Sequence, residues 1–180
     1  KGLNHLIYEI VDNAVDEHLA GFCKNIHVTL EKDGSATVED DGRGVPVGMH
    51  QKGISAARLV YTTLHAGGKF DDSAYKTSGG LHGVGSSVVN ALSVYMDVQI
   101  SREGYIHHDR YERGVPVVEL EDGLLPTIGK TRKTGTKVNF LPDDTIFEKT
   151  KFRAEEVKSR LHETAYLNPE LTIVFDDKRP

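Results

Sequence analysis

Two short turn sequences constrain the fold of this chain more than any other feature. Asp33-Gly34 and Glu103-Gly104 each lie between two runs in which apolar and polar residues alternate. An acidic residue followed by glycine between such runs indicates a tight turn that joins antiparallel strands. The two turns therefore predict two hairpins, with strands at residues 25–31, 36–40, 95–102 and 105–112.

The remaining segments divide between helical patterns and shorter strand patterns. Residues 3–19 form the longest helical pattern, because their apolar side chains recur every three or four positions. Residues 65–83 are rich in glycine, serine and aspartate, and residues 122–133 are polar, so we expect irregular connections there. We expect helices at 3–19, 55–64, 84–92 and 152–166, and further strands at 117–120, 136–140 and 171–175.

The order of these elements favours one fold class. Strands and helices do not alternate regularly, so a doubly wound parallel sheet is disfavoured. We predict an α+β fold built as a two-layer α/β sandwich, in which helices cover one face of a mixed, mostly antiparallel sheet. The 180 residues suffice for one domain with its own core, and no repeat or linker divides them, so we expect a single domain at 1–180.

Composition excludes several classes of protein. No run approaches the ~18 consecutive apolar residues of a membrane span, so no membrane association is expected. Cys23 is the only cysteine, which excludes an internal disulfide and suits a reducing cytoplasm. The chain begins at Lys1 without a methionine, and we interpret it as a piece of a longer protein. A net charge of −5 argues against binding nucleic acid through overall charge, and the basic cluster at 130–133 is better explained as a solvated loop.

The first motif with chemical potential lies on the predicted helix at 3–19. Glu9 and Asn13 are four residues apart, so both side chains lie on one helix face, and Asp16 extends the row. A carboxylate at the margin of an apolar face can act as a general base, and an amide oxygen can complete a Mg²⁺ shell with phosphates and water. An ordinary solvated helix face explains the same residues, so this motif alone leaves both hypotheses open.

The second motif lies where the predicted strand at 36–40 ends. Asp40 is followed by Gly42 and Gly44, which let the backbone turn tightly and let a flat ligand approach closely. A buried carboxylate at this point could accept a hydrogen bond from an exocyclic amino group such as that of adenine. Aspartate–glycine turns are also common in ordinary loops, so this motif is weak by itself.

The third motif, Gly79-Gly-Leu-His-Gly-Val-Gly85, leads into the predicted helix at 84–92. Closely spaced glycines expose backbone N–H groups that can surround phosphates, and a helix N-terminus adds partial positive charge. The pattern is neither a Walker loop nor the dinucleotide-binding fingerprint. We favour phosphate binding over a flexible linker, because the glycines run directly into an apolar helix start. His82 lies inside this loop and is the one histidine that we associate with the site.

Together the three motifs resemble the nucleotide-binding boxes of the GHKL ATPases. That superfamily comprises type II topoisomerases, 90-kilodalton heat-shock chaperones, MutL and histidine kinases. Longer runs at 9–17, 64–70 and 75–92 closely resemble the B subunits of bacterial DNA gyrase and topoisomerase IV, and the resemblance covers essentially the whole chain. It implies the Bergerat ATP-binding fold, with ATP and Mg²⁺ as cofactors and an ATP lid at about residues 65–85.

The resemblance also implies roles for individual residues in the pocket. Glu9 is expected to activate the attacking water, and Asn13 is expected to bind the metal ion and the nucleotide. Asp40 is expected to contact adenine, with Thr136 bonding nearby through water.

Other implied contacts lie at the mouth of the pocket and in the lid. Arg43 is expected at the mouth, paired with Glu17. Arg102 resembles the rim arginine that inhibitors of the aminocoumarin type contact. Further nucleotide contacts are expected from Gly44, Pro46, Lys69, Gly80, Leu81, His82, Gly83, Val84 and Gly85.

The function implied by the resemblance is that of a cytoplasmic, ATP-hydrolysing DNA topoisomerase, whose ATPase domain powers strand passage and supercoiling. Partners in the complete enzyme would be DNA and the A subunit of gyrase or topoisomerase IV. The family's dimer-clasping N-terminal arm and its lysine-bearing transducer domain have no counterpart in this sequence. Homodimerisation and full turnover are therefore expected to need other regions, while the isolated chain binds nucleotide and turns over slowly. Alternative hypotheses are a MutL-like repair ATPase and a nucleotide switch without hydrolysis.

Overall fold

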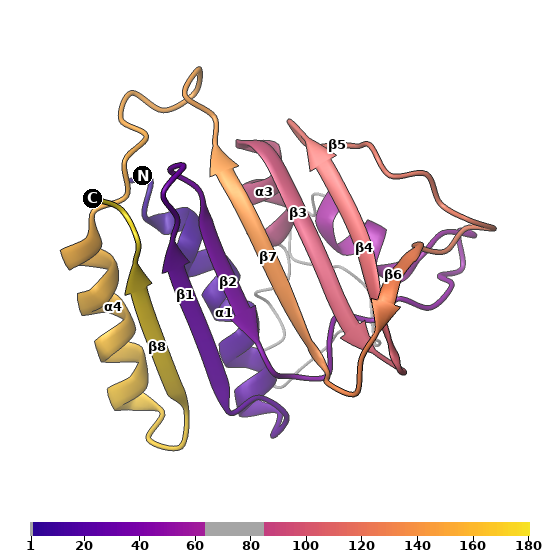
Figure 1. The fold of residues 1–180 in the computed structure, drawn as a ribbon, viewed down its shortest axis with the longest axis horizontal. Coiled ribbons are helices and arrows are strands. Elements are labelled where there is room, and N and C mark those ends of the chain that lie inside the picture. Colours follow the sequence, from indigo (N-terminus) through magenta and orange to yellow (C-terminus); the bar gives the residue numbers. More distant parts are fainter. Residues whose placement is uncertain (1, 64–84) are drawn as a thin grey trace.

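The computed structural model describes residues 2–63 and 85–180 and contains one sheet covered by helices (Figure 1). The described helices are α1 His5–Leu19, α2 Ala56–Thr62, α3 Gly85–Ala91 and α4 Ala154–Leu167. The described strands are β1 Asn25–Leu30, β2 Ala36–Asp40, β3 Ser93–Arg102, β4 Tyr105–Glu112, β5 Val115–Pro116, β6 Thr127–Lys130, β7 Gly135–Pro142 and β8 Thr172–Asp177. No helix among these is long and apolar enough to cross a membrane.

The strands form one mixed sheet in the order β5-β4-β3-β7-β2-β1-β8, with β6 also paired to β4. Only β1 and β8 run parallel, and the other pairs described are antiparallel. Helices α1, α2 and α3 lie behind the sheet in Figure 1, and α4 lies beside β8 at one edge. The predicted fold class is therefore confirmed.

Both predicted hairpin turns are confirmed, and their backbone geometry explains the residues found there. Gly34 has a φ of 91°, and in the second turn Glu103 and Gly104 have φ values of 55° and 90°. The two consecutive positive φ values of the second turn match the right-handed twist of the flanking strands, whereas the first turn has one such residue, Gly34. The turns join β1 to β2 and β3 to β4 in the predicted antiparallel pairs.

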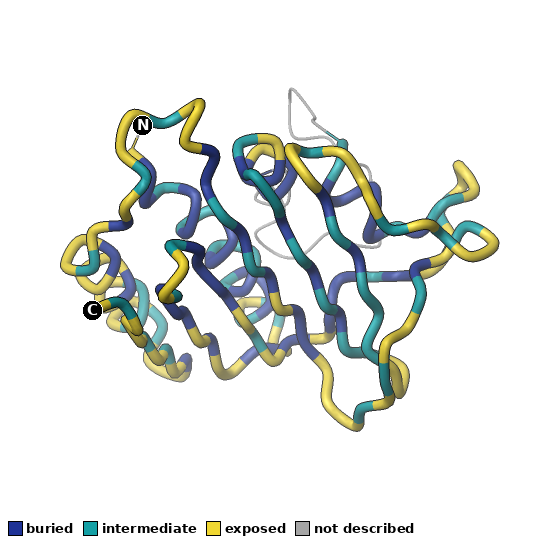
Figure 2. Tube along the Cα trace, turned by 45° about the horizontal axis from the view of Figure 1, so that its top comes forward, coloured by how far each residue is buried: buried dark blue, intermediate teal, exposed yellow. Residues whose placement is uncertain are grey.

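The core lies between the helices and one face of the sheet (Figure 2, dark blue). Alternate residues of the central strands point into it, so Met96, Val98 and Ile100 of β3 are fully buried beside Phe140 of β7. The apolar stripe of α1 packs against this face through Leu6, Ile7, Ile10, Val11 and Ala14. Packing of this stripe fixes which side of α1 faces the sheet.

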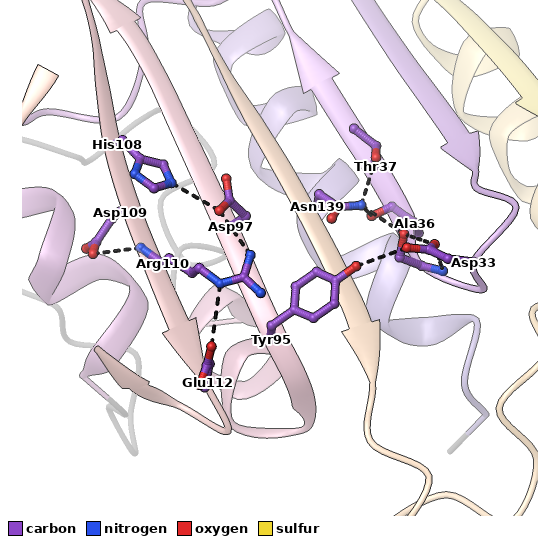
Figure 3. Close-up of polar contacts among 11 residues, drawn as sticks. Asp33, Ala36, Thr37, Tyr95, Asp97, His108, Asp109, Arg110, Glu112 and Asn139 are labelled. Atoms are coloured by element: carbon purple, nitrogen blue, oxygen red, sulfur yellow. Dashed lines mark hydrogen bonds and ion pairs between the residues drawn. The ribbon is translucent and has the colours of Figure 1, made fainter. Parts of the chain in front are cut away.

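The opposite face of the sheet is polar and carries its own network of contacts (Figure 3). Asp97 of β3 accepts hydrogen bonds from His108 and Arg110 of β4, at 3.0 and 3.2 Å. The Arg110 guanidinium lies 4.5 Å from the ring centroid of Tyr95, whose hydroxyl donates to Asp33. These residues belong to the solvated side of the sheet, so the helix-covered side is where a buried site can form.

One predicted strand is wrong, and two short strands were not predicted. Residues 117–120 form no strand, because the Val118 carbonyl accepts a hydrogen bond from Arg58 at 2.7 Å instead of joining a ladder. Strand β6 lies inside residues 122–133, which we predicted to be an irregular connection because glycine and polar residues there give no alternating strand pattern. Strand β5 has only two residues, which is too short for a sequence pattern. The other predicted elements are present, with boundaries shifted by a few residues.

Met96 provides a test of the core. Replacing this fully buried side chain with alanine removes apolar contacts and leaves a cavity against the neighbouring strand β7, so we expect Met96→Ala to lower the free energy of unfolding by about 2–5 kcal/mol. Urea denaturation would measure the change. The control Tyr166→Ala alters a side chain that is 80% exposed, and it should leave the midpoint unchanged. Equal effects of the two substitutions would contradict the assigned core.

Candidate functional site

A row of polar side chains lies on α1 beside the apolar stripe, and two of its members contact α3. Glu9, Asn13 and Glu17 are spaced by four residues and so share one helix face. We expected Asp16 to extend this row, but it is Glu17 that lines the cavity with Asn13. The other residues that line this cavity are Ile10, Val38, Asp40, Gly44, Val45, Tyr61, Thr136 and Val138.

Asp40 is the last residue of β2 and lines this cavity. Burial raises the pKa of its carboxyl to about 7 and the negative charge of Glu17 adds to the rise, although the Gly42 N–H donates to Asp40 Oδ1 at 2.8 Å. Thr136 lies opposite Asp40 in the register of β2 and β7. Its hydroxyl oxygen accepts a hydrogen bond from the Val45 N–H at 3.1 Å. The cavity therefore offers a carboxylate and a hydroxyl between apolar walls, which are formed by Ile10, Val38, Val45 and Val138.

The predicted pair of Arg43 and Glu17 is present, and Glu17 lines the cavity. Arg43 Nη2 donates to Glu17 Oε1 at 2.6 Å, and both Nε and the backbone N–H of Arg43 donate to Oε2. The guanidinium also lies 3.9 Å from the ring centroid of Phe22. The turn that brings Arg43 here requires glycine next, because Gly44 has a φ of 86° and a side chain would meet the Ser101 carbonyl.

Arg102, which the resemblance places at the rim, bonds a residue that lines the cavity. Its Nη1 donates to the carbonyl of Gly44 at 2.8 Å, which ties the end of β3 to the cavity lining. Pro46 is half-buried and is not among the residues that line the cavity. The expected contacts from Lys69, Gly80, Leu81, His82, Gly83 and Val84 lie outside the described residues.

Glu9 lies one helical turn before Asn13 and has a partner that sequence reasoning missed. His5 Nε2 lies 3.0 Å from Glu9 Oε2, and because a carboxylate only accepts, this nitrogen is the donor. The spacing of four residues on one helix was the available signal. The side chain of Glu9 is 29% exposed, so it remains accessible to water on its other side.

Gly85 is also needed for the position of Glu9. A Cβ at residue 85 would overlap Glu9 Oε1, so any other residue there would force the Glu9 side chain out of its present position. The sequence suggested this glycine as a phosphate-binding backbone group. The structure adds a steric requirement that is independent of any ligand.

Asn13 has an orientation that suits a metal ligand. Its Nδ2 donates to Ser86 Oγ at 2.5 Å, which turns the amide so that Oδ1 is buried and has no partner among the described residues. An unpartnered buried oxygen is costly unless a ligand, ion or water satisfies it, and amide oxygens are acceptable Mg²⁺ ligands. The described residues contain no cluster of three metal-ligating side chains.

Comparisons with known proteins agree with this geometry. Residues 1–146 match the family described as histidine kinase-, DNA gyrase B- and HSP90-like ATPases. Over 179 residues the chain is 54% identical to the DNA gyrase B subunit of Thermotoga maritima and 54% identical to the DNA topoisomerase 4 B subunit of Streptococcus pneumoniae serotype 4. Each match covers 99% of this chain but only 27% of the relative, so the chain spans little more than a quarter of their length.

The family match covers α1, the end of β2 and the start of α3, which are the three elements that bring Glu9, Asn13, Asp40 and Gly85 to one site. The chain therefore belongs to the family of histidine kinase-, DNA gyrase B- and HSP90-like ATPases.

Proposed function

We propose that this chain is the ATP-binding and ATP-hydrolysing domain of a bacterial type II topoisomerase B subunit, with gyrase as the first assignment and topoisomerase IV as the second. The observation that carries the proposal is a cavity lined by both Asp40 and Asn13, whose buried Oδ1 has no partner among the described residues. A purine at Asp40 would place its phosphates along α1. Relatives named as gyrase and topoisomerase 4 subunits match equally well.

Adenine recognition follows from the walls of the cavity. The ionised carboxylate of Asp40 would accept a hydrogen bond from the exocyclic amino group, and Thr136 would bond the ring edge through water. The apolar walls exclude water from the faces of the base, which strengthens the polar contact at its edge. A base with a carbonyl in place of the amino group would oppose one acceptor with another, so ATP is favoured over GTP.

Glu9 would orient a water molecule and accept its proton as the water attacks the terminal phosphate. Its hydrogen bond to His5 fixes one carboxylate oxygen and leaves the other for that water. Asn13 Oδ1 would hold Mg²⁺, which when bound neutralises charge on the phosphates. Positioning and electrostatics supply most of the catalysis of phosphoryl transfer, so small shifts of α1 against α3 would lower the rate.

In the complete protein the hydrolysis would power DNA strand passage in the cytoplasm. The names of the relatives support a topoisomerase B subunit, and the partners we propose are DNA, the corresponding A subunit and a second copy of the B subunit. Arg102 at the rim would form part of a surface open to aminocoumarin-type inhibitors. Strand passage and the three partners involve parts of the complete protein outside this chain, and each depends on ATP binding at this site.

Replacing Glu9 separates hydrolysis from binding. We expect Glu9→Gln to lower the ATP turnover of the complete protein by at least about 100-fold, because the amide keeps the size of the side chain but cannot accept the proton. Nucleotide affinity, measured by calorimetric titration with a non-hydrolysable ATP analogue, should change by less than about threefold. The matched control Glu155→Gln alters an α4 carboxylate remote from the cavity. Parent-like turnover of Glu9→Gln would exclude this residue as the base and would favour a switch without hydrolysis.

The metal assignment is tested by Asn13→Ala. The substitution removes Oδ1, a cavity-lining amide oxygen that lacks a partner in the described part of the chain. We expect it to weaken the Mg²⁺ dependence of nucleotide binding, because one ligand to the cation is lost. Titration of the non-hydrolysable analogue with and without Mg²⁺ gives the ratio of dissociation constants. Ser86→Ala removes the partner of Nδ2 and should have a smaller effect. An unchanged ratio in Asn13→Ala would contradict the assigned ligand.

The raised pKa of Asp40 predicts pH-dependent binding. Only the ionised carboxylate accepts a strong hydrogen bond from the adenine amino group. Nucleotide affinity should therefore rise as pH increases through about 7 and level off above about 8. Asp40→Asn should bind nucleotide weakly at every pH. A pH-independent affinity in the parent chain between about pH 6 and 8 would contradict the assignment of Asp40.

The same pKa makes a second prediction, for stability. The carboxyl ionises near 3.8 when exposed but near 7 in the fold, so the folded state holds the extra proton between these values and stability falls as pH rises through them. Asp40→Asn removes this cost. We expect the variant to melt at a higher temperature than the parent at about pH 8, and the difference should shrink towards about pH 4.

A further inference from the structure

A buried ion pair lies outside the residues that line the cavity. Arg58 of α2 and Asp109 of β4 have side chains that are 11% and 1% exposed. Arg58 Nε donates to Asp109 Oδ2 at 2.8 Å and Nη2 donates to Oδ1 at 2.9 Å, so the pair is bidentate. Nη2 also donates to the carbonyl of Val118. This pair joins a helix, a strand and a loop at one buried point.

Tyr111 completes the cluster. Its hydroxyl donates to Asp109 Oδ2 at 2.5 Å, and the Arg58 guanidinium lies 5.9 Å from its ring centroid. Burial raises the pKa of Tyr111, and the charge of Asp109 raises it further, so the hydroxyl stays protonated and remains a donor. Buried ion pairs are poor sources of stability compared with apolar packing, but a fully bonded one fixes geometry.

The neighbours of Asp109 on β4 show that the cluster belongs to the helix side of the sheet. His108 and Arg110 reach Asp97 on the polar face (Figure 3), and successive side chains of a strand point to opposite faces. Asp109 therefore lies on the face that α2 covers, where its side chain meets Arg58.

Tyr61 connects this cluster to the cavity. It follows Arg58 by three residues, so both lie on the same side of α2. Its ring lies 6.2 Å from the ring of Tyr111, centroid to centroid, and its carbonyl accepts a hydrogen bond from Asn90 Nδ2 at 2.9 Å. The side chain is 2% exposed and lines the same cavity as Asp40. Tyr61 is thus a cavity wall held by α2, by α3 and by an aromatic neighbour on β4.

We propose that Arg58, Asp109 and Tyr111 are positioning residues that hold Tyr61 as a rigid wall and thereby limit the size of the purine that the cavity accepts. The proposal rests on the ATP-binding function proposed above. A substituent that pushes on Tyr61 must also displace Tyr111 or α2, and both are tied to Asp109. Under this proposal, unsubstituted adenine fits beside Tyr61 without such a displacement.

The test is a selectivity ratio, the dissociation constant of a substituted nucleotide divided by that of ATP. The two probes are 2-chloro-ATP and N⁶-methyl-ATP, titrated against the purified chain with Mg²⁺. We expect the parent to reject at least one of them by about tenfold or more, because a packed pocket tolerates extra atoms poorly. Tyr61→Leu should lower that ratio at least about fivefold, and Tyr111→Phe, which removes only the hydroxyl, should lower it about threefold.

A control separates positioning from general loss of stability. Arg113 and Asp143 form another ion pair, with Asp143 only 4% exposed, and neither lines the cavity. Asp143→Asn should lower the melting temperature and leave the selectivity ratio unchanged. Arg58→Met is a second test of the cluster, and where it does not fold, Tyr111→Phe decides.

Three outcomes would overturn the proposal while leaving ATP binding intact. They are a parent that accepts both analogues as well as ATP, a parent-like ratio in Tyr61→Leu and Tyr111→Phe, and an equal change of the ratio in Asp143→Asn. A parent chain that binds no ATP would instead overturn the proposed function itself, so the two failures are distinguishable.

Discussion

The carboxylate of Glu17 joins the helix layer to the end of β2, and the cavity depends on this contact. It accepts three hydrogen bonds from Arg43, and a Cβ at residue 42 would lie 2.8 Å from its Oε2. α1 and the loop after Asp40 are therefore held together at a short distance. Glu9 and Asn13 lie on the same face of the same helix, so the contact that holds α1 against this loop also helps to position them.

That arrangement has an electrostatic cost. Burial beside Glu17 raises the pKa of Asp40 to about 7, so the fold would be more stable with a neutral residue at this position. The cost is consistent with a binding role, because an exocyclic amino group can replace the water that the carboxylate has lost. Sites built for ligands commonly retain groups that destabilise the empty protein. The neighbouring Asp41 has a structural role instead, because its carboxylate accepts hydrogen bonds from the backbone N–H groups of Lys24 and Asn25 at the start of β1.

The hairpins, the amphipathic helix and the positions of Glu9, Asn13 and Asp40 could be predicted because each depends on residues close in sequence. The missed features depend on contacts between distant segments. Residues 117–120 have strand-like composition, yet Val118 is held by Arg58, which lies 60 residues earlier. Tyr61 looks like any apolar helix residue until β4 brings Tyr111 against it. The steric role of Gly85 is equally invisible, because it requires Glu9, which is distant in sequence, to be in contact in space.

The described elements on both sides of residues 64–84 are anchored at the site by independent contacts. α2 ends directly before this segment, and the cluster around Asp109 fixes it against β4. α3 begins directly after the segment, where Gly85 contacts Glu9 and Ser86 accepts a hydrogen bond from Asn13. A ligand that moves Asn13 or Tyr61 would therefore act on α2 or α3. The proposed nucleotide binding would be coupled to the positions of these two helices, because Tyr61 of α2 is a wall of the cavity and Ser86 of α3 holds the amide of Asn13.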